Sequence, residues 1–208
     1  MPSQTKRVYF DDYVFFVDKN VYEPAEDSFL FAENLKVEAD ESVLDMGTGC
    51  GILGVLAAKK ARDVIAVDVN PYAVHCTKYN AKVNNVRGKI TIVQGDLFAW
   101  LSEKATFDMI LFNAPYLPEN ESVAGSWIDR AWAGGATGRQ IIDRFISEVP
   151  KHLRRSGRVL LVQSTLADVT ETMHRFAEYH MYTRVLAERA LPFFETIVLL
   201  EARFDTVL

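Results

Sequence analysis

Four consecutive residues, Asn113, Ala114, Pro115 and Tyr116, could together hold a planar NH2 group. They directly follow the apolar run 107–112, which is expected to be a strand, so they stand at a strand end. The Asn113 side-chain carbonyl and the Ala114 backbone carbonyl could each accept one N–H, while Tyr116 packs on the flat face. The nitrogen lone pair would then point toward an electrophilic methyl group without a strong base. The tetrad therefore predicts methylation of an amide or amine nitrogen.

The same four residues are also compatible with a simple turn. Asn and Pro are ordinary turn residues, and Pro115 stiffens any turn by fixing its own φ angle. The tetrad alone supports both interpretations equally, so the choice depends on what binds beside it.

A glycine-rich turn at residues 47–51, Gly-Thr-Gly-Cys-Gly, is the second candidate site. It joins a predicted strand, 43–46, to a predicted helix, 52–61, and bare backbone at a helix N-terminus lets a nucleotide-like ligand approach closely. An acidic residue stands at three successive strand ends, at positions 45, 68 and 96. Asp68 could accept from both ribose hydroxyls of an adenosine, and Asp96 with Leu97 could flank the adenine.

Two classes of cofactor compete for this turn. Gly49, Gly51 and Gly54 satisfy the dinucleotide spacing G-x-G-x-x-G, which would suit a nicotinamide oxidoreductase. Asp45 argues against that choice, because its carboxylate would repel a pyrophosphate and attract the ammonium and sulfonium of S-adenosylmethionine. The sequence therefore favours methyl transfer from S-adenosylmethionine, with S-adenosylhomocysteine as product, over hydride transfer.

Composition is typical of one soluble globular domain, with 208 residues, 49% hydrophobic and 25% charged. We expect a single domain over 1–208, in which 1–23 form an N-terminal hairpin extension. The absence of an apolar run of membrane-spanning length, or of a signal-peptide core in 1–7, predicts a cytoplasmic protein. The net charge of −5 disfavours stable nucleic-acid binding. Two cysteines and four histidines lack metal-ligand spacing, so we expect no metal site.

Strand and helix patterns alternate along the chain, which predicts a parallel sheet with right-handed crossovers. The fold class is therefore α/β, with a mostly parallel seven-stranded sheet and helices on both faces. The last two strands have no helix between them, so the last strand must be antiparallel. Expected strands are 43–46, 64–69, 90–94, 107–112, 159–163, 183–188 and 196–202, after a short hairpin at 8–17. Expected helices begin at 24, 52, 72, 138 and 167. The fourth helix should run over 138–153, with Ser156 and Gly157 as its stop signal and the basic run 151–158 as its solvated end. Residues 117–137 should be irregular.

Six segments together resemble the HemK-related class I methyltransferases, which have a Rossmann-like fold and methylate the glutamine of the Gly-Gly-Gln motif in class I release factors. The segments are 21–28, 45–51, 68–71, 95–97, 113–116 and 131–139. The most specific are Tyr-Glu-Pro-Ala-Glu-Asp and Trp-Ala-Gly-Gly, and they look most like the short archaeal and eukaryotic branch. The resemblance covers most of the chain and implies S-adenosylmethionine as the cofactor.

The resemblance also assigns roles to individual residues. It implies that Asn113 binds the substrate amide and that Tyr116 stacks on it, with Ala114 and Pro115 completing the catalytic tetrad. One departure is Ala114, which replaces the usual first Pro; activity should survive, with a looser loop. The cofactor residues that the resemblance implies are Ser28, Asp45, Gly47, Thr48, Gly49, Asp68, Val69, Asp96, Leu97 and Asn113.

The resemblance further implies a partner. In the short branch this is a small zinc-binding activator subunit, so the chain is expected to form a heterodimer. Residues 89–93 should form an open edge strand, which invites another chain. Only about forty residues precede the glycine-rich turn, too few for the helical N-terminal domain of bacterial relatives, so the substrate must dock on the core domain or the partner.

Other functions stay open at this point. An adenine exocyclic amine or a protein lysine could replace the glutamine as acceptor, since the same carbonyl pair could receive either amine. A noncatalytic scaffold that binds S-adenosylmethionine only for stability is the alternative from a different class.

Overall fold

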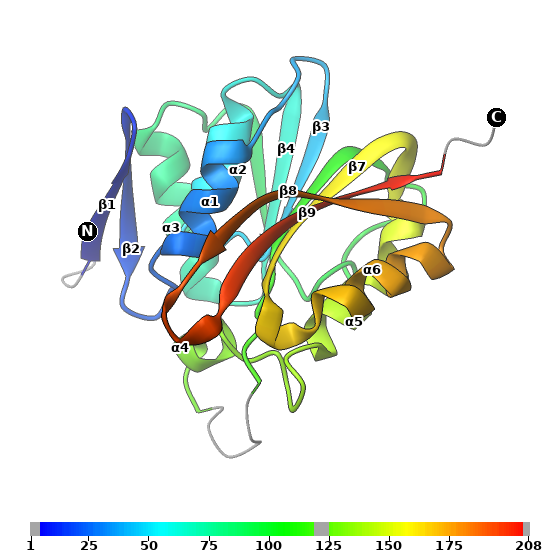
Figure 1. Ribbon diagram of the computed structural model, residues 1–208. Helices are drawn as coiled ribbons and strands as arrows, with labels where there is room; N and C mark the ends of the chain where they lie inside the picture. The colour runs from blue at the N-terminus through cyan, green and yellow to red at the C-terminus, as the bar shows by residue number, and fades with distance from the viewer. Residues whose placement is uncertain (1–4, 119–124, 206–208) are drawn as a thin grey trace.

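A computed structural model describes residues 5–118 and 125–205, and its centre is a seven-stranded sheet (Figure 1). The strand order is β5-β4-β3-β6-β7-β9-β8. Neighbouring strands from β5 to β7 run parallel, while β9 is antiparallel to both β7 and β8. This confirms the predicted mostly parallel sheet with an antiparallel last strand. The strands are β3 Ser42–Met46, β4 Asp63–Asp68, β5 Ile90–Gln94, β6 Phe107–Asn113, β7 Leu153–Ser164, β8 Met181–Ala190 and β9 Thr196–Phe204.

Helices cover both faces of this sheet, as predicted. Alternate residues of each buried strand point to opposite faces, so Leu111 of β6 packs in one hydrophobic core and Phe112 in the other. The first core also contains residues of α1, α2 and α3, and the second contains residues of α5 and α6. Among the described residues no helix is long and apolar enough to cross a membrane. The helices are α1 Glu26–Asn34, α2 Ile52–Ala58, α3 Pro71–Val83, α4 Trp127–Arg130, α5 Gln140–His152 and α6 Val169–Glu178.

The predicted N-terminal hairpin is present as a separate two-stranded antiparallel sheet, β1 Thr5–Phe10 and β2 Tyr13–Asp18. Two asparagine side chains hold it on the core, Asn80 in α3 and Asn84 at the end of that helix. Asn80 accepts from the Phe16 N–H at 2.9 Å and donates to the Phe16 carbonyl at 2.9 Å, and Asn84 bonds Val14 in the same way. Each asparagine amide takes the place of a neighbouring strand, so the edge of β2 is satisfied.

The fourth helix ends within one residue of its predicted end, but the predicted stop signal is wrong. That helix, α5, ends at His152, and β7 begins at once at Leu153 and continues through Ser156 and Gly157. Gly157 permits a close strand contact instead of stopping a helix, because a Cβ there would lie 2.8 Å from the Asp108 carbonyl oxygen. Of the basic run, only Lys151 lies exposed in the last turn of the helix, as predicted. Arg158 lies instead in β7 and forms a largely buried ion pair with Glu41.

The expectation of an irregular segment at 117–137 is also wrong in part. Ser126 and Asp129 form a reciprocal capping box that begins the short helix α4. Residues 119–124 of this segment lie outside the described residues.

Candidate active site

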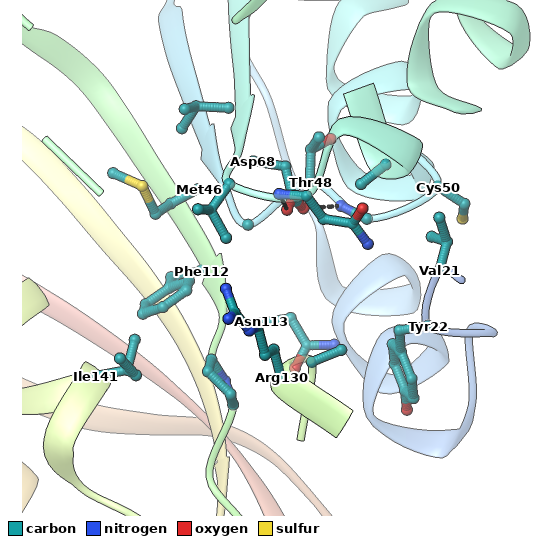
Figure 2. A pocket seen from close by; sticks show the side chains of 18 of the residues that line it. Val21, Tyr22, Met46, Thr48, Cys50, Asp68, Phe112, Asn113, Arg130 and Ile141 are labelled. Atoms are coloured by element: carbon teal, nitrogen blue, oxygen red, sulfur yellow. Dashed lines mark hydrogen bonds between the residues drawn. The ribbon is translucent and has the colours of Figure 1, made fainter. Parts of the chain in front are cut away.

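A pocket of about 300 Å³ lies where β3, β4, β5 and β6 end (Figure 2). Parallel sheets bind ligands in this position, outside the carboxyl ends of the strands. Its lining includes most of the residues assigned to the cofactor: Ser28, Gly47, Thr48, Gly49, Asp68, Val69, Asp96, Leu97 and Asn113.

The glycine-rich turn has the backbone shape that its sequence suggested. Gly47, Gly49 and Gly51 have φ angles of 63°, 58° and 89°, in the left-handed region that glycine adopts without strain. Gly51 is also close-packed, because a Cβ there would lie 2.8 Å from the Thr77 side chain, whereas a Cβ on Gly49 would meet nothing within 4 Å. The turn therefore leaves open space at Gly49 for a ligand.

Asp45 lies beneath this turn and does not line the pocket. It is 1% exposed, and its Oδ2 accepts hydrogen bonds from Thr48 Oγ1 at 2.6 Å and from the Gly54 N–H at 2.8 Å. Burial raises the pKa of the Asp45 carboxyl to about 7. Its Oδ1 is buried and has no hydrogen-bond partner among the described residues, so it remains able to accept from a cationic group.

Asp68 and Asp96 take different positions around the pocket. Asp68 Oδ2 accepts from the Gly49 N–H at 2.9 Å, which ties the turn to the end of β4, and burial raises the pKa of this carboxyl. Asp96 is about half exposed and forms an ion pair with Arg144 at 2.8 Å. Both lie at the wall of the pocket, so both remain candidates for contacts with a bound nucleoside.

Asn113 is held by a carboxylate that the sequence interpretation had not assigned to the site. Its Nδ2 donates to Asp27 Oδ2 at 3.1 Å and to Ser28 Oγ at 3.2 Å. The hydroxyl of Tyr22 donates to Asp27 Oδ1 at 2.8 Å, and that of Tyr116 lies 3.5 Å from Asp27 Oδ2. Because a carboxylate only accepts hydrogen bonds, it fixes the Asn113 amide with its nitrogen toward Asp27. The Asn113 Oδ1 is consequently free, and it is buried without a partner among the described residues.

A smaller recess adjoins the main pocket. It is lined by Asp27 and the whole tetrad together with Tyr22, Leu117, Ala131 and Trp132. Asn113 and Pro115 line both spaces, whereas Ala114 and Tyr116 line only the recess. The junction of the two spaces at Asn113 is where a group could pass from one bound molecule to another.

The segment 131–139, which carries part of the family resemblance, holds the tetrad loop in place. The Leu117 N–H donates to the Trp132 carbonyl at 3.0 Å, and the Gly134 N–H donates to the Leu117 carbonyl at 3.0 Å. Gly138 has a φ of 73°, and a Cβ there would lie 2.3 Å from the Tyr116 carbonyl oxygen. Glycine at this position therefore lets the segment lie directly against the tetrad.

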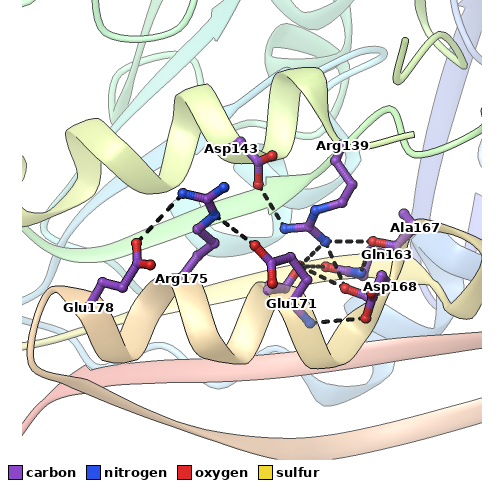
Figure 3. Close-up of polar contacts among 9 residues, drawn as sticks. Arg139, Asp143, Gln163, Ala167, Asp168, Glu171, Arg175 and Glu178 are labelled. Atoms are coloured by element: carbon purple, nitrogen blue, oxygen red, sulfur yellow. Dashed lines mark hydrogen bonds and ion pairs between the residues drawn. The ribbon is translucent and has the colours of Figure 1, made fainter. Parts of the chain in front are cut away.

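Arg139 then fixes the segment to the core (Figure 3). Arg139 is 7% exposed, and its guanidinium donates from Nη1 to the Ala167 and Asp168 carbonyls, at 2.6 and 2.7 Å, and from Nη2 to Asp143 at 2.7 Å. These bonds join the start of α5 to the turn after β7, so Arg139 supports the site without lining either space.

Several pocket residues were missed by sequence reasoning. Asp27 was given no role in the site, although it lies in the segment 21–28, whose resemblance to the family was the available signal. Phe112 and Ile141 supply apolar wall, and Trp127, with Arg130 stacked 4.9 Å from its ring centre, lies in the segment that was expected to be irregular. Cys50 also lines the pocket, but burial raises the pKa of its thiol well above the usual range, so it is a packing residue.

The sequence and fold match known methyltransferases. The family model "Methyltransferase small domain" matches residues 25–189. A protein of Methanocaldococcus jannaschii assigned as a protein N5-glutamine methyltransferase is 42% identical over 86% of this chain and 90% of its own length. The human methyltransferase HEMK2 is 36% identical over 69% of this chain and 71% of its own length.

The fold also matches a chain of a solved methyltransferase structure. The E. cuniculi Mtq2-Trm112 complex, described as responsible for methylation of the eRF1 translation termination factor, contains a chain with a TM-score of 0.72 and 25% identity. The match covers 89% of this chain and 99% of that one.

Proposed function

The chain belongs to the methyltransferase small domain family and, within it, to the HemK-related protein N5-glutamine methyltransferases, and from this premise we propose the reaction of its site. The protein transfers a methyl group from S-adenosylmethionine to the side-chain amide nitrogen of the glutamine in the Gly-Gly-Gln motif of a class I release factor. The observation that carries the proposal is the buried, unpartnered Oδ1 of Asn113, at the junction of the pocket and the recess.

The pocket residues fit S-adenosylmethionine, which when bound supplies an electrophilic methyl group. Asp45 does not line the pocket, but its carboxyl lies beneath the glycine-rich turn with Oδ1 unpartnered, and its negative charge would attract a cationic ligand bound above the turn. Gly49 leaves open space at the turn, and Asp68 would accept from the ribose hydroxyls. Ser28 and Thr48 would contact the amino-acid end, and Val69, Asp96 and Leu97 would surround the adenine.

The tetrad would orient the acceptor. Asn113 Oδ1 accepts one N–H of the glutamine amide, the Ala114 carbonyl accepts the other, and Tyr116 packs on the amide plane in the recess. Holding both N–H groups turns the nitrogen lone pair toward the main pocket, which is a positional contribution to catalysis. With S-adenosylmethionine bound, the oriented nitrogen would take the methyl group as the sulfur–methyl bond broke, and it would lose one proton to water.

Mass spectrometry tests this proposal directly. A release factor with a Gly-Gly-Gln motif, incubated with the protein and S-adenosylmethionine, should gain about 14 Da, one CH2, on that glutamine. The Asn113→Ala variant should lose the gain while still binding S-adenosylmethionine in calorimetry, because it removes the acceptor atom and leaves the pocket. Modification of an adenine or a lysine in its place would move the assignment to those acceptors, and full cellular function of Asn113→Ala would support a noncatalytic scaffold.

A small zinc-binding activator subunit belongs to the same proposal. The strand β5 lies at the edge of the sheet, as the sequence predicted, and its outer backbone groups are available for pairing with another chain. The assay is therefore run with and without such a subunit. We expect the chain without this subunit to be less active. By this proposal the chain is a single domain.

A further inference from the structure

Two adjacent phenylalanines at the turn between β8 and β9 are fully exposed. Phe193 and Phe194 are 95% and 104% exposed, more than any other large apolar side chain of the described residues. An exposed aromatic ring forgoes the free energy of burial, and contiguous apolar surface often marks a binding site. Both residues also have positive φ angles, 63° and 64°, which is a strained conformation for a bulky side chain. Strain of this kind persists mainly where function uses it.

Hydrogen bonds close the turn and connect it to neighbouring segments. The Leu191 N–H donates to the Glu195 carbonyl at 2.8 Å, and the Thr196 N–H donates to Thr165 Oγ1 at 3.1 Å. Arg189, which precedes the turn in β8, donates to the Glu26 carbonyl at 3.3 Å and pairs with Glu33 at 2.7 Å. The turn is thus fixed to α1, the helix that carries Asp27.

The phenylalanine pair lies at the same end of the sheet as the acceptor recess. Asn113 of β6 stands opposite Val162 of β7, and Val162 stands opposite Leu199 of β9. The start of β9 therefore lies level with the tetrad, and the turn projects just beyond it, at the end of the sheet where α4 also lies (Figure 1).

Three acidic groups lie near Tyr116, which lines the recess. Burial, and then the negative charges of Asp27, Glu195 and Glu26, raise the pKa of the Tyr116 hydroxyl. Glu195 directly follows the phenylalanine pair, and Glu26 is exposed beside Asp27. Exposed apolar surface and negative charge consequently lie together at the end of the sheet that carries the recess.

We propose that Phe193 and Phe194, with the carboxylates of Glu26 and Glu195, are the docking surface for the acceptor protein. An apolar side chain of the acceptor packs on the phenylalanine pair, and a basic residue near the glutamine meets the carboxylates. A second copy of this chain fits less well, because its own carboxylates would face these across a two-fold axis. An anionic lipid surface would be repelled by the same charges. The inference rests on the proposed function and adds to it how the substrate is held.

Steady-state kinetics with the intact release factor test the surface. Phe193→Ser combined with Phe194→Ser should raise KM for the release factor about tenfold or more, with kcat and the affinity for S-adenosylmethionine unchanged. Tyr182→Ser, at the opposite end of β8 and 44% exposed, is the matched control and should leave KM unchanged. Glu195→Lys should also raise KM, and this effect should weaken as salt concentration increases.

A glycine variant separates docking from folding. Phe193→Gly with Phe194→Gly removes the rings and relieves the positive φ angles, so the melting temperature should hold or rise while KM still increases. The docking inference is overturned if wild-type protein methylates the release factor and the double variants keep the wild-type KM. It is equally overturned if the variants lose only self-association or activator binding. Failure of the wild-type reaction itself would instead count against the proposed function.

Discussion

Asp27 and Asn113 are 86 positions apart in the chain, and the Asp27 carboxylate accepts a hydrogen bond from the Asn113 amide nitrogen at 3.1 Å. This bond decides which end of the amide faces the recess. With the nitrogen bound to Asp27 and Ser28, the oxygen is left as the acceptor at the reaction site. Asp27 is therefore a positioning residue for Asn113.

Replacing Asp27 with asparagine should reduce kcat about 100-fold, because the new amide can donate and no longer forces the orientation of Asn113. The affinity for S-adenosylmethionine should change little. Tyr22→Phe, which removes only the 2.8 Å hydrogen bond to the other carboxylate oxygen, should have a smaller effect on kcat. Wild-type kcat in Asp27→Asn would contradict the positioning role.

The raised pKa of Asp45 should make stability depend on pH. A carboxyl of the unfolded chain loses its proton near pH 4, whereas folded Asp45 keeps it up to about pH 7. The folded state therefore binds the extra proton between these values, and stability falls as pH rises through this window, by at most about 4 kcal/mol. Urea unfolding at pH 5 and pH 8 should show this decline in wild-type protein. The free energy of unfolding of Asp45→Asn should depend much less on pH.

The affinity for S-adenosylmethionine should also depend on the ionisation of Asp45. Unlike the stability, it should increase as pH rises. A cation near Asp45 favours its ionised form, so the dissociation constant should fall as pH rises from about 6 to 8. Calorimetry in buffers of different ionisation enthalpy should detect proton release below pH 7. In Asp45→Asn the affinity should be lower and nearly independent of pH, and equal pH dependence in both proteins would exclude Asp45 as the linked group.

Gly138→Ala should lower both stability and activity. The added Cβ would lie 2.3 Å from the Tyr116 carbonyl oxygen, and the φ of 73° is itself unfavourable for alanine. We expect a loss of about 2–4 kcal/mol in the free energy of unfolding and a reduced kcat from a displaced tetrad. Gly88→Ala is the control, since its Cβ would meet nothing within 4 Å, and it should change neither quantity appreciably.

Restoring proline at position 114 should have a small effect. The Ala114 N–H donates to the Val162 carbonyl at 3.4 Å, so proline would remove one long hydrogen bond while restricting the unfolded chain. These changes oppose each other, and the free energy of unfolding should change by less than about 1 kcal/mol. If the tetrad loop is looser with alanine, the variant should also show slower amide exchange at Tyr116 and Leu117.

The sequence by itself determined the order of strands and helices, because alternating apolar patterns report which face of each element is buried. It also determined the glycine-rich turn, the tetrad and their most plausible chemistry, since those signals lie within a few consecutive residues. The role predicted for Gly157 was nevertheless wrong. In a sequence, a glycine that ends a helix cannot be distinguished from one that permits close strand contact, because the neighbouring Asp108 carbonyl is not visible there.

Only the tertiary structure decided which side chains meet. The pairing of Asp27 with Asn113, and the position of the exposed Phe193 and Phe194 at the same end of the sheet as the recess, both depend on segments distant in the chain. Local propensity carries no information about such contacts, because they are set by the register of β6, β7 and β9 and by how α1 packs on the sheet. The tertiary structure therefore determines the orientation of the Asn113 amide, and so which of its atoms is left to bind the acceptor.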